Sequence, residues 1–405
     1  MTQFRPFAAL RYALAGAPAA APADYTTVVA PPYDVLSNAD RAALEALDAR
    51  NSVRLDFPHG ATDPDAYDGA RRQLQAWLAE GTLARDSSET FTVYRMTATD
   101  DTGRTRATTG VVGGLGLEPP GQGDVLPHEE TTSKDKADRL NLIRATRINT
   151  SPIWGLSMAS GLGARCATIA DATAPAAHAV DGDGVRHEAW IVSDPAHIEA
   201  LATIVSSAPV VIADGHHRFE TALAFQAESR ADGDGPGGHD ALMALVVELA
   251  EGELEVRGIH RIITLPSGLD PVGWLATWFE ATRDEPVDAS IRSRMGEAGS
   301  LALVTPRGTW LLCPREGAFA DGIELDSQRI AAALAATPGA SVRYHHDVTT
   351  VVAAAQNESD TIGVLLRPAT VAQIRAVAEA RTRMPAKTTF FWPKPRTGMV
   401  FRPVD

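Results

Sequence analysis

An apolar strand runs into an amphipathic helix through the sequence Asp-Gly-His-His-Arg at positions 214–218. Pro209–Ala213 has the length and composition of a short buried strand, and the helix after the turn places four side chains on one face: Phe219, Ala222, Leu223 and Gln226. A glycine-containing turn of this kind aims backbone N–H groups and the positive end of the helix at whatever lies above it. The segment therefore predicts an anion-binding turn.

The charges in this turn also favour an anionic ligand. His216, His217 and Arg218 lie in the first helical turn, where each cation opposes the helix dipole by about 0.3–1 kcal/mol unless an anion is bound. A structural alternative stays open, in which Asp214 only caps the helix while Arg218 and Glu220 face solvent.

Strands and helices alternate along the rest of the chain, which is the pattern of a mixed α/β fold. Helices are predicted from Ser37 and over residues 68–81, where capping residues and apolar spacing agree. Strands are predicted over 91–97 and 105–117, joined by a turn at 100–103.

The length of 405 residues exceeds what one small core requires, so two or three domains are expected. We place a first α/β region, which carries the anion-binding turn, at residues 1–265, and a smaller α/β region at 266–383. Residues 384–405 are predicted to be an extended segment that packs back on the first region. A strand is expected over 254–265, and the Gly/Asp-rich stretch 231–240 predicts a mobile loop.

A second group of charged residues surrounds a predicted helix over residues 134–146. In the loop before it, Glu129 can serve as a general base or a metal ligand. Lys136, Arg139 and Arg147 share one side of the helix, where they can contact phosphate. The alternative is a capped surface helix whose charges pair with one another.

Two further segments carry side chains capable of binding chemistry. The aromatic run at 390–392 lies between Lys387 and Lys394, and it predicts a buried terminal strand rather than a base-stacking surface. His345 and His346 would point to opposite faces of a strand, which argues against a metal site there.

The charge and the apolar content limit the partners. There are 37 basic and 51 acidic side chains, and the net charge of −14 argues against nucleic acid and anionic membranes. The longest apolar run, 241–247, is too short to span a membrane. Cys166 and Cys313 show no disulfide or zinc spacing, which favours a reducing compartment. We therefore expect a cytoplasmic protein with a small-molecule substrate, and its assembly as a homodimer is left open.

Six segments spread over the whole chain carry a family pattern: Val29–Val35, Leu126–Glu129, Lys136–Leu140, Ala145–Ile153, Ile212–Leu223 and Met384–Phe391. In this order they resemble the bacterial and archaeal family called domain of unknown function 1015. The family name implies no activity, so function depends on the residues themselves.

The turn at 214–218 is also similar to the phosphate-binding turn of the ParB and sulfiredoxin superfamily, whose members bind ATP or CTP phosphates at that helix start and include free serine kinases. This likeness implies a ParB/sulfiredoxin-like core with a second α/β region. His216 stands where sulfiredoxins carry a catalytic Cys, so their thiol chemistry is not implied. The acidic charge also departs from the DNA-binding ParB proteins.

Pattern and resemblance together indicate an enzyme that uses ATP or another nucleoside triphosphate, with magnesium, to phosphorylate a small metabolite; the likeness implies a free amino acid such as serine. Phosphate binding is assigned to six residues: Gly215, His216, His217, Arg218, Lys136 and Arg139. Asp214 is assigned to magnesium or to deprotonation of the acceptor, Glu129 is assigned as general base, and His216 completes the catalytic set.

Two other functions stay open. A metal-dependent hydrolase of a small amide or phosphoester would place a divalent metal among four side chains: His128, Glu129, His216 and His217. A nucleotide-binding regulator would keep the anion-binding turn and lack turnover.

Overall fold

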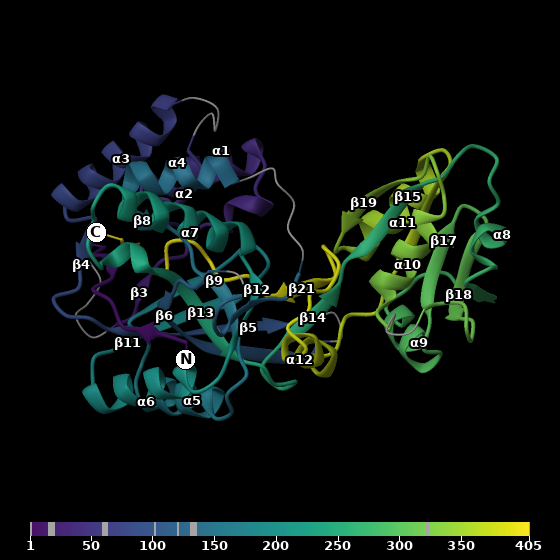
Figure 1. Ribbon diagram of the computed structural model, residues 1–405. Coiled ribbons are helices and arrows are strands. Elements are labelled where there is room, and N and C mark those ends of the chain that lie inside the picture. Colours follow the sequence, from purple (N-terminus) through teal and green to yellow (C-terminus); the bar gives the residue numbers. More distant parts are fainter. Residues whose placement is uncertain are drawn as a thin grey trace. The chain divides into compact units, whose positions relative to one another are not determined.

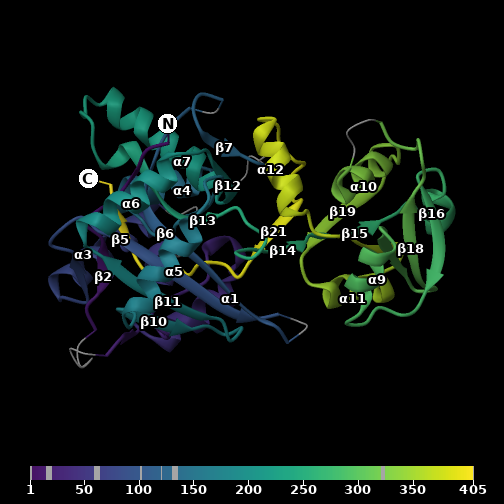
Figure 2. The same ribbon diagram turned by 90° about the horizontal axis from the view of Figure 1, so that it is seen from below.

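The computed structural model describes residues 2–14, 21–58, 64–100, 103–119, 121–129, 136–320 and 324–404. The chain divides into two compact units (Figures 1 and 2). Unit 1 comprises Met1–Leu254 and Pro393–Asp405, and unit 2 comprises Glu255–Trp392. The chain thus leaves and re-enters unit 1, so the site can draw on residues from both ends of the sequence.

Unit 1 is built on a ten-stranded mixed sheet with the order β3-β10-β11-β5-β6-β13-β9-β12-β7, and β1 pairs with β6. Its strands are β1 (Phe4–Arg5), β3 (Ala23–Asp24), β5 (Phe91–Thr99), β6 (Thr105–Gly116), β7 (Val125–Pro127), β9 (Ile153–Ser157), β10 (Ala177–Val180), β11 (Arg186–Val192), β12 (Val210–Asp214) and β13 (Ala241–Glu248). The predicted hairpin is confirmed, since β5 pairs with β6 in antiparallel register. The mixed α/β class is confirmed as well.

Helices lie on both faces of this sheet in Figure 1, with α5 and α6 on one face and α3, α4 and α7 on the other. The helices of unit 1 are η1 (Tyr33–Val35), α1 (Asn38–Leu47), α2 (Val53–Asp56), α3 (Pro64–Ala79), α4 (Lys136–Thr146), α5 (Leu162–Ala172), α6 (Pro195–Ser206), α7 (His216–Ala231) and η2 (Gly238–Asp240). The core between sheet and helices contains fully buried side chains such as Ile153, Leu162 and Val210. Burying such side chains contributes about 1.5–3 kcal/mol each.

Local signals explain where these helices start. Ser37 and Asp40 form a capping box at α1, and the Asp194 side chain accepts the His197 N–H at the start of α6. The expected loop at 231–240 joins α7 to β13 inside unit 1, and Asp240 ties it down by accepting from the Gly237 N–H and the Gln226 amide.

Short strands attach the chain's ends to unit 1. β2 (Leu10–Tyr12) pairs with β4 (Leu83–Arg85), and β22 (Arg402–Pro403) pairs with β8 (Ile148–Asn149). Phe401, next to β22, is fully buried. The last residues of the chain are therefore part of the unit 1 core.

Unit 2 is built on a six-stranded antiparallel sheet with the order β16-β18-β17-β20-β15-β19. Its elements are β14 (Glu255–Gly258), β15 (His260–Thr264), α8 (Pro271–Leu275), β16 (Phe279–Asp284), α9 (Ile291–Glu297), β17 (Leu301–Thr305), β18 (Gly308–Pro314), α10 (Asp326–Ala335), β19 (Ser341–His345), α11 (Val348–Asn357), β20 (Thr361–Leu365), α12 (Val371–Glu379) and β21 (Thr389–Trp392). Two separate apolar clusters fill it, one with α8 and α10 and the other with α9 and α11.

Two strands replace the single strand expected over 254–265. β14 pairs with β21, whereas β15 joins the six-stranded sheet, so the chain changes sheets at Ile259. The unit boundary at residue 254 therefore differs from the expected division at 265, because β15 belongs to the second sheet. The aromatic run at 390–392 forms β21, as predicted, and Phe391 is 1% exposed.

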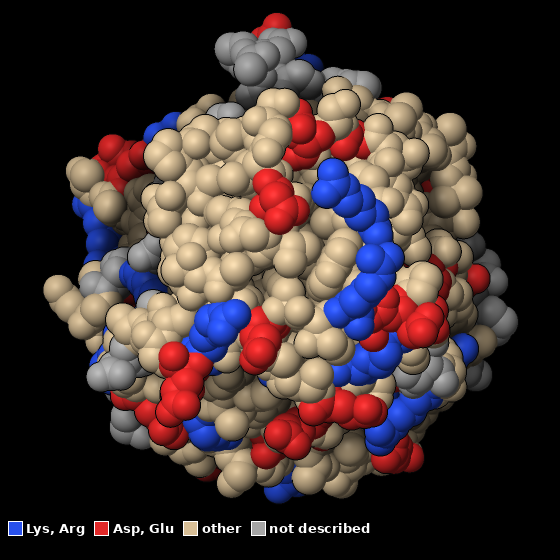
Figure 3. All heavy atoms as spheres, turned by 90° about the vertical axis from the view of Figure 1, so that its right-hand side faces the viewer, with Lys and Arg blue, Asp and Glu red and all other residues tan. Residues whose placement is uncertain are grey.

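The surface of unit 2 mixes both signs of charge. Figure 3 shows one face, on which basic and acidic side chains lie close together around a large uncharged area. None of the helices that the structure describes has the length and apolarity that a bilayer crossing requires.

Candidate functional site

The predicted strand, turn and helix are present in unit 1. β12 ends at Asp214, Gly215 adopts the left-handed conformation with φ 91° and ψ 28°, and α7 begins at His216. A Cβ at Gly215 would lie 2.7 Å from Ile153 Cγ2 and 3.1 Å from the Arg218 guanidinium, so both conformation and space favour glycine. Gly215 is the N-cap of α7 and offers no side-chain acceptor to its first turn. The positive end of α7 therefore opens toward this turn.

Asp214 pairs with two cations. Its Oδ1 contacts Lys394 Nζ, and its Oδ2 accepts from Arg218 Nη2 at 2.9 Å. Burial alone would raise the pKa of Asp214, but Lys394 and Arg218 outweigh it and lower the pKa to about 2. Asp214 is therefore a permanent carboxylate, and the alternative in which it merely caps α7 is wrong, because Gly215 occupies the cap position.

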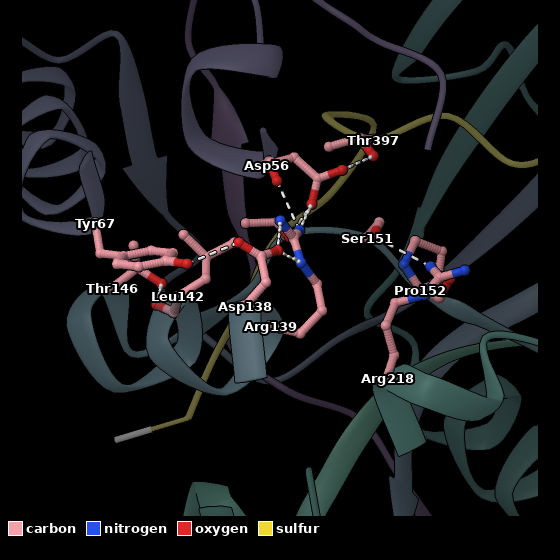
Figure 4. A network of polar contacts seen from close by, with 11 residues as sticks. Asp56, Tyr67, Asp138, Arg139, Leu142, Thr146, Ser151, Pro152, Arg218 and Thr397 are labelled. Carbon is pink, nitrogen blue, oxygen red and sulfur yellow. Dashed lines mark hydrogen bonds and ion pairs between the residues drawn. The ribbon is translucent and has the colours of Figure 1, made fainter. Parts of the chain in front are cut away.

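Arg218 turns inward. Its Nη1 donates to Ser151 Oγ at 3.1 Å and to the Pro152 carbonyl at 2.6 Å, as Figure 4 shows. The side chain is 10% exposed. The alternative of a solvated Arg218 is therefore wrong as well, and the guanidinium links α7 to the segment that leads into β9. Its assignment to phosphate stays a prediction.

Asp34 joins this group from the far N-terminal side. It lies in η1, which follows Pro31 and Pro32, and solvent reaches its side chain. Neighbouring groups nevertheless restrict the hydration of the Asp34 carboxyl, and this desolvation raises its pKa. The negative charge of Asp214 raises the pKa of Asp34 further. Two carboxyls whose pKa values move in opposite directions thus lie near one another.

The Glu129 loop reaches the same turn because β7 pairs in parallel with β12. His128 is 1% exposed, and its Nδ1–H donates to the Ile212 carbonyl at the end of that pairing. Its Nε2 lies 3.3 Å from Glu129 Oε1. The rings of His128 and His216 have centroids 5.1 Å apart.

His216 is held neutral by this environment. Burial, followed by the neighbouring His128, lowers the pKa of His216 to about 4. Its Nε2 is buried and has no hydrogen-bond partner among the described residues. His217 follows it in α7 and is partly exposed. The structure thus places Glu129, His216 and Asp214 around the start of one helix.

Arg139 contacts Asp56 rather than the turn at residues 214–218. It is 5% exposed, and its Nη1 donates to the Asp56 carbonyl at 2.6 Å and approaches Asp56 Oδ1 at 3.3 Å (Figure 4). The guanidinium also pairs with Asp138 and stacks on the Tyr33 ring at 3.8 Å. A small cavity of about 40 Å³ lies between Arg139 and Arg218. The phosphate role of Arg139 stays a prediction, although its donors are already used inside the protein.

Lys136 and Arg147 are the other two cations of the predicted helix. Lys136 begins α4, but its side chain lies outside the described residues. Arg147 follows α4 with φ 55°, and its guanidinium stacks on Phe225 at 5.0 Å. The expected shared cationic side is therefore not formed by Arg147.

Lys394 and Asp34 are the site residues that sequence reasoning missed. The C-terminal segment that carries Lys394 is held by Arg396, which pairs with Asp181, while the Arg396 N–H donates to Tyr94 Oη at 3.1 Å. No local pattern signals this contact, because Lys394 and Asp214 are 180 positions apart. Asp34 had one signal, the rigid Pro-Pro pair before it.

Magnesium fits the carboxylates of this site, since it usually takes one or two carboxylates together with substrate phosphates. Asp214, whose pKa is lowered, is such a carboxylate. Among the described residues, no group of three or more His, Cys, Asp or Glu side chains is arranged to hold a metal. His345 and His346 stack with centroids 5.2 Å apart instead of facing opposite ways, because His346 lies beyond the end of β19.

Comparison with known proteins gives one family match. The model of the family described as "Protein of unknown function (DUF1015)" matches residues 4–337. No curated protein matches the chain by sequence.

Solved structures with a related arrangement include three distant ones. A conserved hypothetical protein from Pyrococcus furiosus is 11% identical, with 67% of this chain and 88% of that chain covered and a TM-score of 0.36. A free serine kinase in complex with AMP, in a mutant form, is 11% identical, with 66% and 83% covered and a TM-score of 0.36. SbnI from Staphylococcus aureus, truncated at its C-terminus, is 12% identical, with 68% and 82% covered and a TM-score of 0.37.

Proposed function

The chain belongs to the DUF1015 family, whose description names no activity, and from its own site we propose that it is a nucleotide-dependent phosphotransferase acting on a small metabolite. The proposal rests on the residues at the start of α7. A ParB/sulfiredoxin-like core and a free amino acid such as serine as substrate belong to the same proposal, and they rest on the sequence resemblance alone.

The observation that carries the proposal is the pair of carboxyls with opposite pKa shifts. Asp214 is held ionised by Lys394 and Arg218, whereas crowding and the Asp214 charge raise the pKa of Asp34. Carboxyls driven apart in this way typically divide their tasks, one remaining a charged ligand and the other exchanging a proton. Phosphoryl transfer to a hydroxyl needs both tasks at one place.

The phosphates of the nucleotide would bind at the first turn of α7. Backbone N–H groups of residues 215–218 and the helix dipole favour negative charge there. Lys394 pairs with Asp214 beside the turn, and its ammonium group would contact a phosphate oxygen when a nucleotide binds. His216, neutral because its pKa is lowered to about 4, would act as a hydrogen-bond donor rather than a cation.

Magnesium, when bound, supplies positive charge that neutralises the transferring phosphoryl group. Asp214 would hold it, because this carboxylate is ionised at any physiological pH. The residues of the chain would otherwise bind and orient the nucleotide and move one proton.

Two carboxyls compete for the role of general base. Glu129 is the residue assigned from sequence, and it lies beside His128 and close to His216. Asp34 has a raised pKa and lies near Asp214. We assign proton transfer to Asp34, since a base works best with a pKa shifted toward the working pH, and we keep Glu129 as the competing residue.

Turnover of a defined substrate panel tests the proposal. The purified full-length protein would be incubated with ATP, CTP or ADP, magnesium and single amino acids, and phosphorylated products would be followed by phosphorus NMR. We expect transfer to a hydroxyl-bearing amino acid. Nucleotide binding without any transfer or hydrolysis would instead indicate a regulator. Turnover of a substrate in a control sample that lacks nucleotide would indicate a hydrolase.

A further inference from the structure

Unit 2 buries a histidine whose proton position is fixed by its contacts. His260 opens β15 and is 4% exposed. The Leu366 N–H donates to His260 Nδ1 at 3.1 Å. A ring nitrogen that accepts a hydrogen bond carries no proton, so in the neutral ring the proton is on Nε2.

This Nε2–H group has no hydrogen-bond partner among the residues that the structure describes, although it is buried. Buried donors in native proteins nearly always have a partner, which is protein, water or a bound ligand. The orientation of His260 therefore points to an acceptor supplied from outside the chain.

A small cavity beside His260 has room for such an acceptor. It measures about 30 Å³, and its walls include Gly258, Arg292, Leu366 and Arg367. A Cβ at Gly258 would lie 2.4 Å from the Leu366 carbonyl and 3.3 Å from His260 Cε1, so a larger residue there would push into this wall. The volume suits one water-sized particle and excludes a nucleotide or a metabolite.

Most of the charged groups that act on His260 are basic. Arg292 and Arg367 line the cavity, and Arg261 and His346 also act on His260. Asp326 is buried and already pairs with Arg367. Asp347, which also acts on His260, is engaged at the start of α11, where it accepts from the N–H and hydroxyl groups of Thr349 and Thr350. An acceptor with negative charge is therefore favoured over a neutral one.

The same surroundings keep His260 in its neutral form. Burial first, and then Arg292, lower the pKa of His260 to about 3. The ring is thus a hydrogen-bond donor at neutral pH, while the guanidinium of Arg292 provides the charge.

We propose that the cavity next to His260 is a binding site for one small monovalent anion of halide size, with His260 Nε2–H as its hydrogen-bond donor and Arg292 as its main charge partner. The site lies wholly in unit 2 and is independent of the function proposed for unit 1.

Bromide identifies the site directly, because it scatters X-rays anomalously whereas water does not. Crystals of the full-length protein grown in sodium bromide should show an anomalous peak within hydrogen-bond distance of His260 Nε2. A water molecule at that position, with no bromide peak, would overturn the proposal.

Solution measurements add matched variants. The unfolding temperature of the wild type should be higher in sodium chloride than in sodium gluconate at equal ionic strength, because chloride binds only the folded state. His260→Asn keeps an acceptor for the Leu366 N–H and removes the Nε2 donor, so it should lose this difference. Arg292→Gln should reduce it, and Arg307→Gln, a change at an exposed arginine outside the cavity walls, should preserve it.

The variants also define how the proposal fails. An equal chloride effect in His260→Asn and Arg292→Gln would place the anion elsewhere and contradict the site. If His260→Asn does not fold, the bromide peak in the wild type and the Arg292→Gln response still decide the question.

Discussion

The two units hold buried charge in different ways. In unit 1, buried or half-buried carboxylates pair with cations from distant parts of the chain, as Asp214 does with Lys394 and Asp56 with Arg139. In unit 2, the cations around His260 outnumber the carboxylates that face it. Unit 2 also contains one such buried pair, Asp326 with Arg367. The difference is therefore local: the carboxylates of the unit 1 site pair within the chain, whereas at His260 we propose an anion from solution.

This difference bears on function more than on stability. Buried ion pairs often contribute little net stability, because desolvation offsets the attraction between the charges. Perturbed carboxyls gathered near a cleft are more often found where a protein binds or transforms a substrate. The network at the end of β12 in unit 1 has this character, and the predictions below test it against matched positions elsewhere.

The largest effect is expected from Asp34→Asn in unit 1. The substitution keeps the side chain's shape and removes its ability to accept a proton, so turnover should fall by about 10²–10⁴-fold while nucleotide affinity stays nearly unchanged. Steady-state kinetics and nucleotide titration would measure the two quantities.

Glu129→Gln is the matched comparison for that prediction. If Asp34 is the base, Glu129→Gln should reduce turnover less than Asp34→Asn does. The reverse order would return the role of base to Glu129.

Loss of the Asp56 carboxylate should have the largest effect on stability. Asp56 is 2% exposed and contacts Arg139, accepts from Thr150 Oγ1 at 2.6 Å, and accepts from Thr397 Oγ1 at 3.1 Å. Asp56→Ala leaves a buried guanidinium without this carboxylate, so the free energy of unfolding should fall by about 3–5 kcal/mol in urea denaturation.

The exposed pair of Arg95 with Asp171 provides the control, because the Asp171 side chain is 68% exposed. Asp171→Ala should change the free energy of unfolding by no more than about 1 kcal/mol. Similar losses in the two variants would show that burial does not distinguish these pairs.

A smaller effect is expected from Gly215→Ala, compared with Gly161→Ala. Both glycines are left-handed, with φ 91° and 89°, but a Cβ at Gly161 would meet nothing within 4 Å, whereas one at Gly215 would meet Ile153 and Arg218. Gly161→Ala should lose about 1 kcal/mol from backbone strain, and Gly215→Ala roughly 2–3 kcal/mol. Equal losses in chemical denaturation would mean that the turn has room to relax.

The smallest effect is the pH dependence of stability due to two histidines with lowered pKa values, one in each unit. The pKa values of His216 and His260 are lowered from 6.5 to about 4 and about 3. The unfolded chain therefore binds protons that the folded protein does not, so stability should fall as pH decreases below about 7. The loss should be less than about 1 kcal/mol per histidine between pH 7 and pH 6.

His216→Gln and His260→Asn should each reduce the slope of the unfolding free energy against pH by the contribution of one histidine. Chloride should reduce the contribution of His260 alone, since an anion next to Nε2 favours the protonated ring. An unchanged slope in both variants would contradict the assignment of the two neutral histidines.

Sequence alone predicted the parts of this protein whose causes are local. The capping box at Ser37 and the Gly215 turn depend on residues within a few positions of one another. The meeting of Glu129 with the turn was inferred from chemistry, and its cause, the parallel pairing of β7 with β12, is not visible in the sequence.

The remaining features depend on contacts between distant residues. The sequence pattern places Arg139 among the cations that share one side of the helix, yet its partner Asp56 lies 83 positions earlier and holds it inside. Lys394 reaches Asp214 only because the chain returns to unit 1 at Pro393. Contacts between residues so far apart in the sequence leave no periodicity or motif. The pairing of charges in the site could therefore be seen only in the structure.

A crystal structure of the full-length protein with magnesium and a non-hydrolysable ATP analogue tests the central claim most directly. The account predicts phosphate oxygens within hydrogen-bond distance of the backbone N–H groups of residues 215–218, with Asp214 at the metal and Asp34 facing the terminal phosphate. A nucleotide bound elsewhere, with the Gly215 turn empty and Lys394 still paired with Asp214, would contradict it.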